Sequence, residues 1–413
     1  MPASPSTARA INDRLALRLL QQEGPLTAGQ LKQLTGLSRP TVADLVERLT
    51  ASGLITVVGE AGEQRRGPNA RLYGIVADRA HLAALDVRTE SVSVTVSDLL
   101  GRELAGASVP IGGDTGTGPA VEQAVTLVER VAKEAGAERL HTVGIGAPGL
   151  IDPDTGELRD STGLPAWHRR LVAALQERLP RARVIVENET NLAALAEQRD
   201  GAARGRDTFV LLWLGHGTGA AVVLDGALRR GASGGTGEIG FLPVPGTGGV
   251  PSATDCGGGF HSLAGAAAVT ELARAYGLSG EQGGREPAAA ELVRRAAEAS
   301  GEASADEVAS ERGARAADFL DALADRVALG VASVVAVLDP GCVVLGGEIG
   351  QAGGDVLAGR VAERVGRMSP LRTEVRASAL GGGAVVRGAL LTARERAQDE
   401  LFAPAGPPTH PTR

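Results

Sequence analysis

The sequence predicts an α/β protein in which a winged helix-turn-helix head, residues 1–77, precedes a larger α/β body. Three observations predict this architecture. Short amphipathic segments separated by glycine turns occupy the head, and alternating strand and helix patterns occupy the body. The head also holds nine Lys or Arg against six Asp or Glu, a balance of +3, whereas the body holds 33 against 43, a balance of −10. This asymmetry indicates that only the head meets a polyanion.

The composition favours a globular protein of a reducing compartment. Hydrophobic residues make up 43% of the 413 residues, which is enough for a sizeable core. Two cysteines, Cys256 and Cys342, are too few for a disulfide framework. The N-terminus lacks the apolar core of a signal peptide. The longest apolar run, residues 327–344, is interrupted by Asp-Pro-Gly and predicts helix, turn and strand instead of a membrane span. We therefore expect a cytoplasmic protein without membrane contact.

The head contains three predicted helices. The first covers residues 12–22 and ends before Gly-Pro. Thr27 is placed to cap a short second helix that stops at Gly36. Ser38 is placed to cap a third helix, whose first turn contains Pro40, a position where proline is tolerated. Two short helices joined by a glycine-containing turn indicate a helix-turn-helix.

A strand, loop and strand follow the third helix and predict a wing. The strands cover residues 54–58 and 71–76, and the polar loop between them, residues 59–69, carries two adjacent arginines beside Gly-Pro. Such arginines suit insertion into a narrow, electronegative minor groove of DNA. A helical protein-interaction module and a solvated arginine loop are the alternatives. The predicted DNA contacts are Ser38, Arg39, Thr41, Arg65 and Arg66.

The body begins with a predicted strand meander. Residues 81–87 and 91–97 form two strands joined by a tight turn, and residues 98–101 turn into a third. A helix over residues 120–135 and a strand over residues 142–146 come next. This order is typical of the opening of a nucleotide-binding lobe. Farther along, the Glu/Ala/Gly/Ser-rich tract 277–315 predicts polar helices and a loop on the surface.

A carboxylate stands where a parallel strand ends. Residues 184–188 form a β-branched strand that runs into Glu189 and then into an alanine-rich helix. In open parallel sheets, ligands bind outside the carboxyl ends of the strands. Two glycine-rich stretches follow at residues 214–220 and 231–241, and the second contains Gly-Glu-Ile-Gly. Residues 343–347 add a strand that ends in Gly-Gly.

This order of motifs resembles the sugar-kinase half of the ROK family (repressors, open reading frames, kinases), and the Arg-Gly-Pro of the wing resembles that of the family's repressors. The resemblance covers nearly the whole chain. It implies that the body has a two-lobed, actin-like and sugar-kinase-like (ribonuclease H-like) fold. We expect residues 78–190, completed by a C-terminal helix at 384–400, to form one lobe and residues 191–383 the other. The proline-rich segment 401–413 is expected to be a disordered tail.

The kinase machinery that the resemblance implies is altered in this chain. Kinases of the family carry a catalytic Asp where Glu189 stands, and Gly-Gly-Thr where Arg88, Thr89 and Glu90 stand. Lengthening Asp to Glu moves the carboxylate by about 1.5 Å, a misplacement that is costly in rate. The side chains also crowd a turn that should approach phosphate closely. We expect neither enzymatic activity nor a bound cofactor.

The family's sugar-binding residues are partly retained. Asn188 and Glu238 match, Glu189 replaces an Asp, and His261 replaces a Glu. Carboxylates and amides suit hydroxyl-bearing ligands because vicinal hydroxyls both donate and accept hydrogen bonds. These four residues are therefore expected to lie together at the mouth between the lobes, as the binding site of a sugar or another small polar effector.

A structural zinc site, which the family builds from one His and three Cys, is not expected. Phe241 replaces the His, and residues 255–261 hold one Cys, one His and one Asp. Tetrahedral zinc needs four suitable ligands, so we predict that the chain binds no metal.

The leading hypothesis is a DNA-binding transcriptional regulator, a repressor of carbohydrate or secondary-metabolism genes, whose degenerate kinase-like body is a sensor. A sugar kinase with an added head and a dimeric regulator that needs no ligand are the alternatives. One recognition helix per chain, with the family's dimeric habit, implies a homodimer or a dimer of dimers on double-stranded DNA with an inverted repeat.

Overall fold

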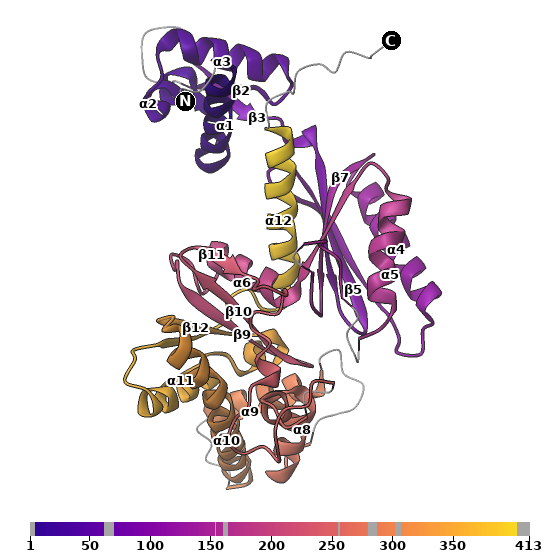
Figure 1. Ribbon diagram of the computed structural model, residues 1–413, viewed down its shortest axis with the longest axis vertical. Coiled ribbons are helices and arrows are strands. Elements are labelled where there is room, and N and C mark those ends of the chain that lie inside the picture. Colours follow the sequence, from indigo (N-terminus) through magenta and orange to yellow (C-terminus); the bar gives the residue numbers. More distant parts are fainter. Residues whose placement is uncertain are drawn as a thin grey trace.

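The computed structural model describes residues 5–61, 70–152, 154–159, 164–254, 257–279, 287–301 and 307–402. The head lies at one end of an elongated molecule, one five-stranded sheet lies in the middle, and a second five-stranded sheet with its helices lies at the other end (Figure 1). The elements of the head are α1 (Pro5–Glu23), β1 (Leu26–Thr27), α2 (Ala28–Thr35), α3 (Arg39–Ala51), β2 (Ile55–Ala61) and β3 (Ala70–Ile75).

The helix boundaries of the head follow from local hydrogen bonds. Thr27 accepts the amide of Gln30, whose side chain accepts the amide of Thr27 in return, and this capping box starts α2. Gly36, at a φ of 71°, ends α2, and Ser38 caps α3 by accepting the amide of Thr41. The three predicted helices are thus confirmed, although α1 begins at Pro5 and so starts earlier than expected.

The strand β1 was not foreseen. It consists of Leu26 and Thr27, which pair antiparallel with Tyr73 and Leu72 of β3. A two-residue strand has no periodicity of its own, so only its partner makes it recognisable. It completes a three-stranded sheet, β1-β3-β2, that closes the head beneath its helices.

The first sheet of the body has the order β6-β5-β4-β7-β8, in which β5 runs antiparallel to the other four strands. The helices α4 and α5 cover one face, whereas α6 and α12 cover the other (Figure 1). At Gly388 of α12 an added Cβ would collide with the backbone of Leu192 in α6, so only glycine allows these helices to pack this closely. The elements are β4 (His81–Val87), β5 (Ser91–Asp98), β6 (Glu103–Pro110), α4 (Thr117–Glu134), β7 (Leu140–Ala147), α5 (Trp167–Arg178), β8 (Arg183–Asn188), α6 (Glu189–Asp200) and α12 (Ala384–Leu401).

The second sheet has the order β11-β10-β9-β12-β13, and α6 packs between the two sheets. One hydrophobic core joins the inner face of this second sheet to α6, α12 and the head. A second hydrophobic core lies between the outer face of this sheet and the helices within residues 261–368. Short 3₁₀ helices are η1 (Ala77–Arg79), η2 (Ile239–Phe241) and η3 (Gly381–Gly383). The other elements are β9 (Phe209–Leu214), β10 (Thr218–Leu224), β11 (Ala227–Arg229), α7 (His261–Ala264), α8 (Ala266–Ala275), α9 (Ala288–Gly301), α10 (Glu307–Leu338), β12 (Cys342–Gly346), α11 (Gly347–Met368) and β13 (Glu374–Ala377).

The interpretation of tract 277–315 as surface helices was wrong for α9. Its residues Leu292, Val293 and Ala296 are buried in the second core, against α10 and α11. The tract looked polar because alanines supply much of this apolar face and weaken its periodicity. The prediction for residues 327–344 is confirmed, since α10 ends at Leu338 and β12 begins at Cys342.

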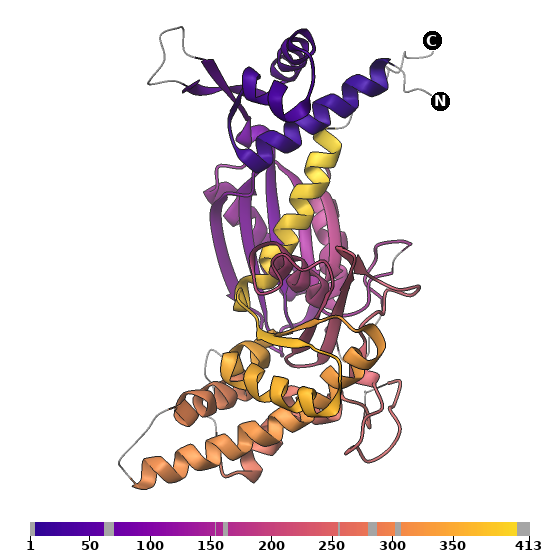
Figure 2. The ribbon, with the colours of Figure 1, turned by 90° about the vertical axis from the view of Figure 1, so that its left-hand side faces the viewer.

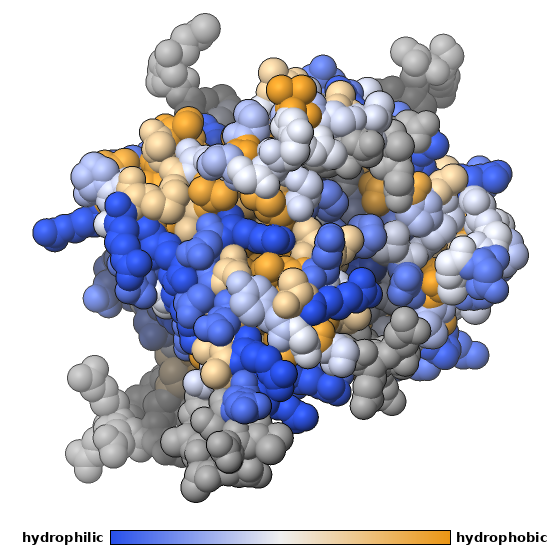
Figure 3. All heavy atoms as spheres, turned by 90° about the horizontal axis from the view of Figure 1, so that it is seen from below, coloured by the Kyte–Doolittle hydropathy of each residue, from blue (hydrophilic) through white to orange (hydrophobic). Residues whose placement is uncertain are grey.

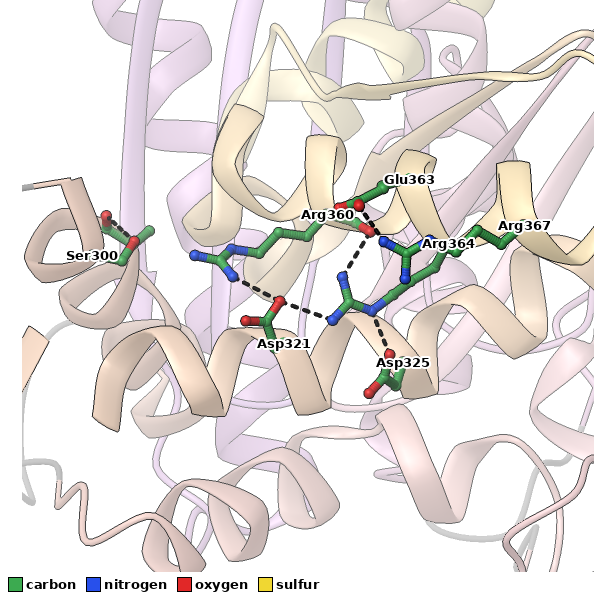
Figure 4. A network of polar contacts seen from close by, with 8 residues as sticks. Ser300, Asp321, Asp325, Arg360, Glu363, Arg364 and Arg367 are labelled. Atoms are coloured by element: carbon green, nitrogen blue, oxygen red, sulfur yellow. Dashed lines mark hydrogen bonds and ion pairs between the residues drawn. The ribbon is translucent and has the colours of Figure 1, made fainter. Parts of the chain in front are cut away.

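At the end of the molecule opposite the head, ion pairs join the helices α10 and α11. Arg360 and Arg364 of α11 both reach Asp321 of α10, at 2.7 and 2.8 Å, and Arg364 also pairs with Asp325 (Figure 4). Viewed from this end, hydrophilic residues alternate with small hydrophobic groups (Figure 3). None of the helices within the described ranges is long and apolar enough to cross a membrane.

Candidate functional site

The N-terminal end of α3 carries three of the five residues that we predicted to contact DNA. Arg39 is exposed and, among the described residues, has no ion-pair partner, whereas Thr41 is half-buried. The Ser38 hydroxyl caps the helix and lies 2.8 Å from the hydroxyl of Thr41. Arg65 and Arg66 of the wing lie outside the described residues, so their part in the interface stays a prediction. Arg39 is therefore the group in this part of the head that is free to meet a ligand.

The orientation of α3 depends on an arginine that the sequence did not single out. Arg48 of α3 donates to Asp13 of α1 at 2.6 Å and also pairs with Asp44. The hydrogen bond to Asp13 raises the pKa of Arg48, with burial opposing it, and the charge remains fixed. This contact ties the exposed helix to the rest of the head.

Four carboxyl groups converge between the two lobes of the body. Glu189 begins α6, Asp86 lies near the end of β4, Glu348 begins α11, and Glu238 immediately precedes η2. Burial raises the pKa of Glu189 most, a backbone hydrogen bond opposes it, and the charges of the other three residues add to it, so that the pKa is about 8. Its Oε2 atom is buried and has no hydrogen-bond partner among the described residues. The raised pKa favours the protonated carboxyl group at neutral pH, and this group is then able to donate a hydrogen bond to a ligand.

Arg88 connects the lobes through this cluster. Its Nε atom lies 2.9 Å from Asp86 Oδ2, and its Nη1 atom pairs with Glu348 Oε1 of the other lobe. The guanidinium also lies 6.0 Å from the ring centre of Trp213. The other carboxylate oxygen of Glu348 lies so close to Gly215 that any side chain there would collide with it. The turn after β4, which the family resemblance associates with phosphate, and the turn after β9 thus lie on either side of the Arg88 guanidinium.

Asn188 is already committed to the protein. Its Oδ1 atom accepts the amides of Thr190 and Asn191 and caps α6, while its Nδ2 atom donates to the carbonyl of Gly149 at 3.0 Å. The preceding Glu187 was missed by sequence reasoning. Its carboxylate accepts from Asn191 at 3.0 Å and from Arg230 Nε at 2.7 Å. Asn188 therefore positions Glu189 by fixing the start of the helix.

Glu238 and His261 lie on the second lobe, beside the cluster. The side chain of Glu238 is accessible, yet the protein around its carboxyl group raises its pKa, and its charge influences Glu189. His261 packs near Gly240, and its pKa is lowered first by burial and then by the nearby His216. The structure thus brings Glu189 and Glu238 together, with Asn188 behind them and His261 to one side.

Unpartnered polar atoms mark the same region. Thr218 at the start of β10 is buried, and its hydroxyl has no hydrogen-bond partner in the described part of the chain. The same holds for one carboxyl oxygen each of Asp86, Glu189 and Glu348. Since buried polar atoms are normally hydrogen-bonded, this concentration is suited to a polar ligand or to water. Thr218 gave no signal in the sequence because a lone strand threonine is most often structural.

The segment for which we predicted no zinc lies partly outside the described residues, because residues 255 and 256 are not described. Phe241, which stands in place of the family's histidine, is described and is the last residue of η2. Within the described ranges no group of three or more His, Cys, Asp or Glu side chains could hold a metal ion. The expectation of a metal-free chain remains a prediction.

Replacing Glu189 with Gln is expected to change how stability depends on pH. The folded protein retains a proton on Glu189 up to pH 8, whereas the unfolded chain loses it near the ordinary pKa of 4.5. The stability that this proton contributes is fully present below pH 4.5 and is lost as the pH rises through 8, at up to about 1.4 kcal/mol per pH unit. The neutral Gln avoids this loss.

Urea unfolding of both proteins between pH 5 and 9 checks the expectation. The Glu189→Gln variant should gain on the wild type as the pH rises, and the control Glu138→Gln, at an exposed position, should follow the wild type. A difference that stays constant over this range would show that Glu189 ionises normally.

Two family models match different parts of the chain. A model described as the ROK family matches residues 83–396, and a model described as the MarR family matches residues 11–67. The chain is 27% identical to the DNA-binding transcriptional dual regulator NagC of Escherichia coli (strain K12) over 244 residues, which are 57% of this chain and 58% of NagC. It is 25% identical to the xylose repressor of Bacillus subtilis over 252 residues, or 59% and 62% of the two chains. The chain thus spans less than two thirds of these regulators.

Kinases are also similar to this chain. A glucokinase of Thermotoga maritima is 32% identical over 245 residues, which are 58% of this chain and 73% of the glucokinase. The crystal structure of a ROK hexokinase from Thermus thermophilus has a TM-score of 0.58 at 28% identity and covers 77% of this chain and 99% of its own.

The fold of nearly the whole chain, head included, is similar to that of a solved structure. It is that of a ROK family transcriptional regulator, a homologue of the Escherichia coli MLC protein, with a TM-score of 0.72 at 20% identity and coverage of 96% of this chain and 98% of that one. The predicted fold class, a winged helix-turn-helix followed by a sugar-kinase-like body, is confirmed. Because the family model extends from β4 into α12 and covers more than half of the sequence, the chain belongs to the ROK family.

Proposed function

We propose that this protein is a DNA-binding transcriptional repressor whose ROK body senses a small polar effector and does not catalyse phosphoryl transfer. The observation that carries the proposal is the ion pair of Arg88 with Glu348, which closes the turn where a kinase would receive phosphate. NagC and the xylose repressors, whose names describe transcriptional regulators, support the same assignment. Control of carbohydrate or secondary-metabolism genes is the corresponding biological role.

The head supplies the DNA contact. Arg39 lies exposed at the N-terminal end of α3, the part of a recognition helix that meets base edges in the major groove. Ser38 and Thr41 shape this end of the helix, and Arg65 and Arg66 would reach the minor groove from the wing. A homodimer or dimer of dimers on an inverted-repeat operator fits one such helix per chain.

Two features of the cleft oppose kinase chemistry. A general base must be deprotonated and within reach of the hydroxyl that it activates, but Glu189 holds its proton to about pH 8 and is longer than the Asp of the kinases. Arg88 also occupies, between Asp86 and Glu348, the turn that kinases leave open with glycine. These features distinguish the chain from the glucokinases that it resembles.

The effector would bind among Glu189, Glu238 and His261, with Asn188 holding the start of α6 in place and Thr218 as an additional contact. The helix α6 begins at Glu189 in this cleft and ends at Asp200, near the head. A ligand alters DNA affinity only if it prefers one arrangement of lobes and head over another. Since α6 contacts both α12 and the second sheet, a change at its first turn is transmitted toward the head.

Operator binding in the presence of a sugar panel tests the proposal. The full chain is footprinted on its own upstream DNA, and fluorescence anisotropy then measures its affinity with and without each sugar. Glu238→Ala should abolish the response to an active sugar while leaving ligand-free binding intact, and the exposed control Glu138→Ala should respond like the wild type. Absence of any specific footprint would refute the DNA-binding assignment.

A coupled assay with ATP and hexoses tests the non-enzyme part separately. We expect no sugar phosphate above background. Sugar phosphate that accumulates with the wild type and is absent with Glu189→Ala would show that the cleft is an active site.

A further inference from the structure

A cavity lies between the head and the body, away from the carboxyl cluster between the lobes. It has a volume of about 510 Å³, within the range of small-molecule sites. The head contributes the end of α1, Pro25 and parts of β2 and β3, and the body contributes the end of α6, the turn after β5 and one side of α12. Figures 1 and 2 both show α12 running from the body to the underside of the head, where this junction lies.

The body side of this junction cavity is cationic. Arg199, Arg387 and Arg394 line it together with a single carboxylate, Asp200. Arg387 donates to Asp200 at 2.7 Å, and Arg394 donates to the carbonyl of Leu100 at 3.1 Å. Arg199 has no hydrogen-bond or ion-pair partner within the described ranges. The cavity wall therefore carries an excess of two positive charges.

These guanidinium groups are close enough to repel one another. The pKa of Arg394 is lowered first by burial and then by the charges of Arg199 and Arg387, which the carboxylates Asp200 and Glu395 only partly offset. A bound anion would relieve this repulsion. Because a guanidinium presents two parallel N–H donors, several of them around one cavity match the oxygens of a phosphate group.

Apolar side chains of both parts also line the cavity. Val58 of β2 in the head and Leu100 of the turn after β5 in the body are 51% and 37% exposed. Exposed apolar side chains that face a cationic wall suit a ligand with an anionic group and an apolar group at opposite ends.

We propose that the junction cavity binds a small phosphomonoester with an apolar substituent, held by Arg199, Arg387 and Arg394 and covered by Val58 and Leu100. Such a ligand touches the head and both helices of the body that reach it, so it ties the two parts together. The proposal concerns binding at this junction and does not depend on DNA binding or on the effector cleft.

Isothermal titration calorimetry of the full chain with phenyl phosphate tests the proposal. We expect saturable binding of one molecule per chain, weaker binding of inorganic phosphate and none of phenol. Arg199→Gln should weaken phenyl phosphate binding by about tenfold or more, since it removes a charge-assisted hydrogen bond. Arg204→Gln, an exposed arginine outside the cavity, is the matched control and should bind like the wild type.

A second variant guards against a folding defect. Leu100→Glu introduces a carboxylate beside Arg394 and should abolish binding of phenyl phosphate, with circular dichroism confirming that each variant is folded. The proposal is overturned if the wild type shows no saturable binding, or if both variants bind normally. It is equally overturned if Glu238→Ala, in the interlobe cleft, loses binding while Arg199→Gln retains it. Weakened DNA binding by Arg199→Gln without any effect on phenyl phosphate would instead make Arg199 a DNA contact.

Discussion

Replacing Arg88 with Ala is expected to lower the free energy of unfolding by about 3–5 kcal/mol, the usual cost of removing one partner from a buried ion pair. Arg88 neutralises Asp86, which is 4% exposed, and reaches Glu348 across the cleft. Without the guanidinium, four carboxyl groups would face one another with no nearby cation. The two lobes should therefore separate as well as unfold more readily.

Urea unfolding and small-angle scattering measure the two effects. The radius of gyration of Arg88→Ala should exceed that of the wild type under native conditions. Arg102→Ala, which removes an arginine that is 78% exposed from its pair with Asp98, is the control and should cost less than about 1 kcal/mol.

Adding Asp86→Asn to Arg88→Ala should recover part of the lost stability, because it removes the uncompensated buried carboxylate. Arg88→Ala within 1 kcal/mol of the wild type, with an unchanged radius of gyration, would show that the arginine does not hold the lobes together.

Replacing Arg39 with Ala is expected to weaken specific DNA binding by about 1–3 kcal/mol, which is roughly fivefold to 150-fold, if its guanidinium contacts a base edge. Nonspecific binding should weaken less, because it depends on the total number of phosphate contacts. Fluorescence anisotropy with an operator and a scrambled duplex, at several salt concentrations, separates the two terms.

Two comparisons sharpen this experiment. Arg204→Ala removes an exposed arginine from the body and should leave both affinities unchanged. Ser38→Ala should act through stability, by about 1 kcal/mol, because the hydroxyl of Ser38 caps α3. Equal losses of specific and nonspecific binding in Arg39→Ala would show that Arg39 contacts phosphate only.

The sequence by itself determined the elements whose causes are local. Thr27 and Ser38 start α2 and α3 through hydrogen bonds to amides three residues away, and Gly36 ends α2 because it tolerates a positive φ. The strand before Glu189, the helix after it and the turn at residues 339–341 are likewise set by residues adjacent in the chain. The family resemblance rests on these local motifs, and it was therefore recognisable before the structure.

Only the tertiary structure decided the contacts between distant residues. Arg88 and Glu348 are 260 positions apart, and no periodicity in either segment predicts that they pair. The sequence shows that Arg88, Thr89 and Glu90 replace Gly-Gly-Thr, but only the fold places the cation of Arg88 inside and leaves Glu90 exposed. The arginine wall of the junction cavity likewise combines α6 with α12, two helices that are nearly two hundred residues apart. The sequence determines the chemistry of each side chain, but packing determines which charges share a low-dielectric space. That packing raises the pKa of Glu189 and pairs Arg88 with Glu348 across the two lobes.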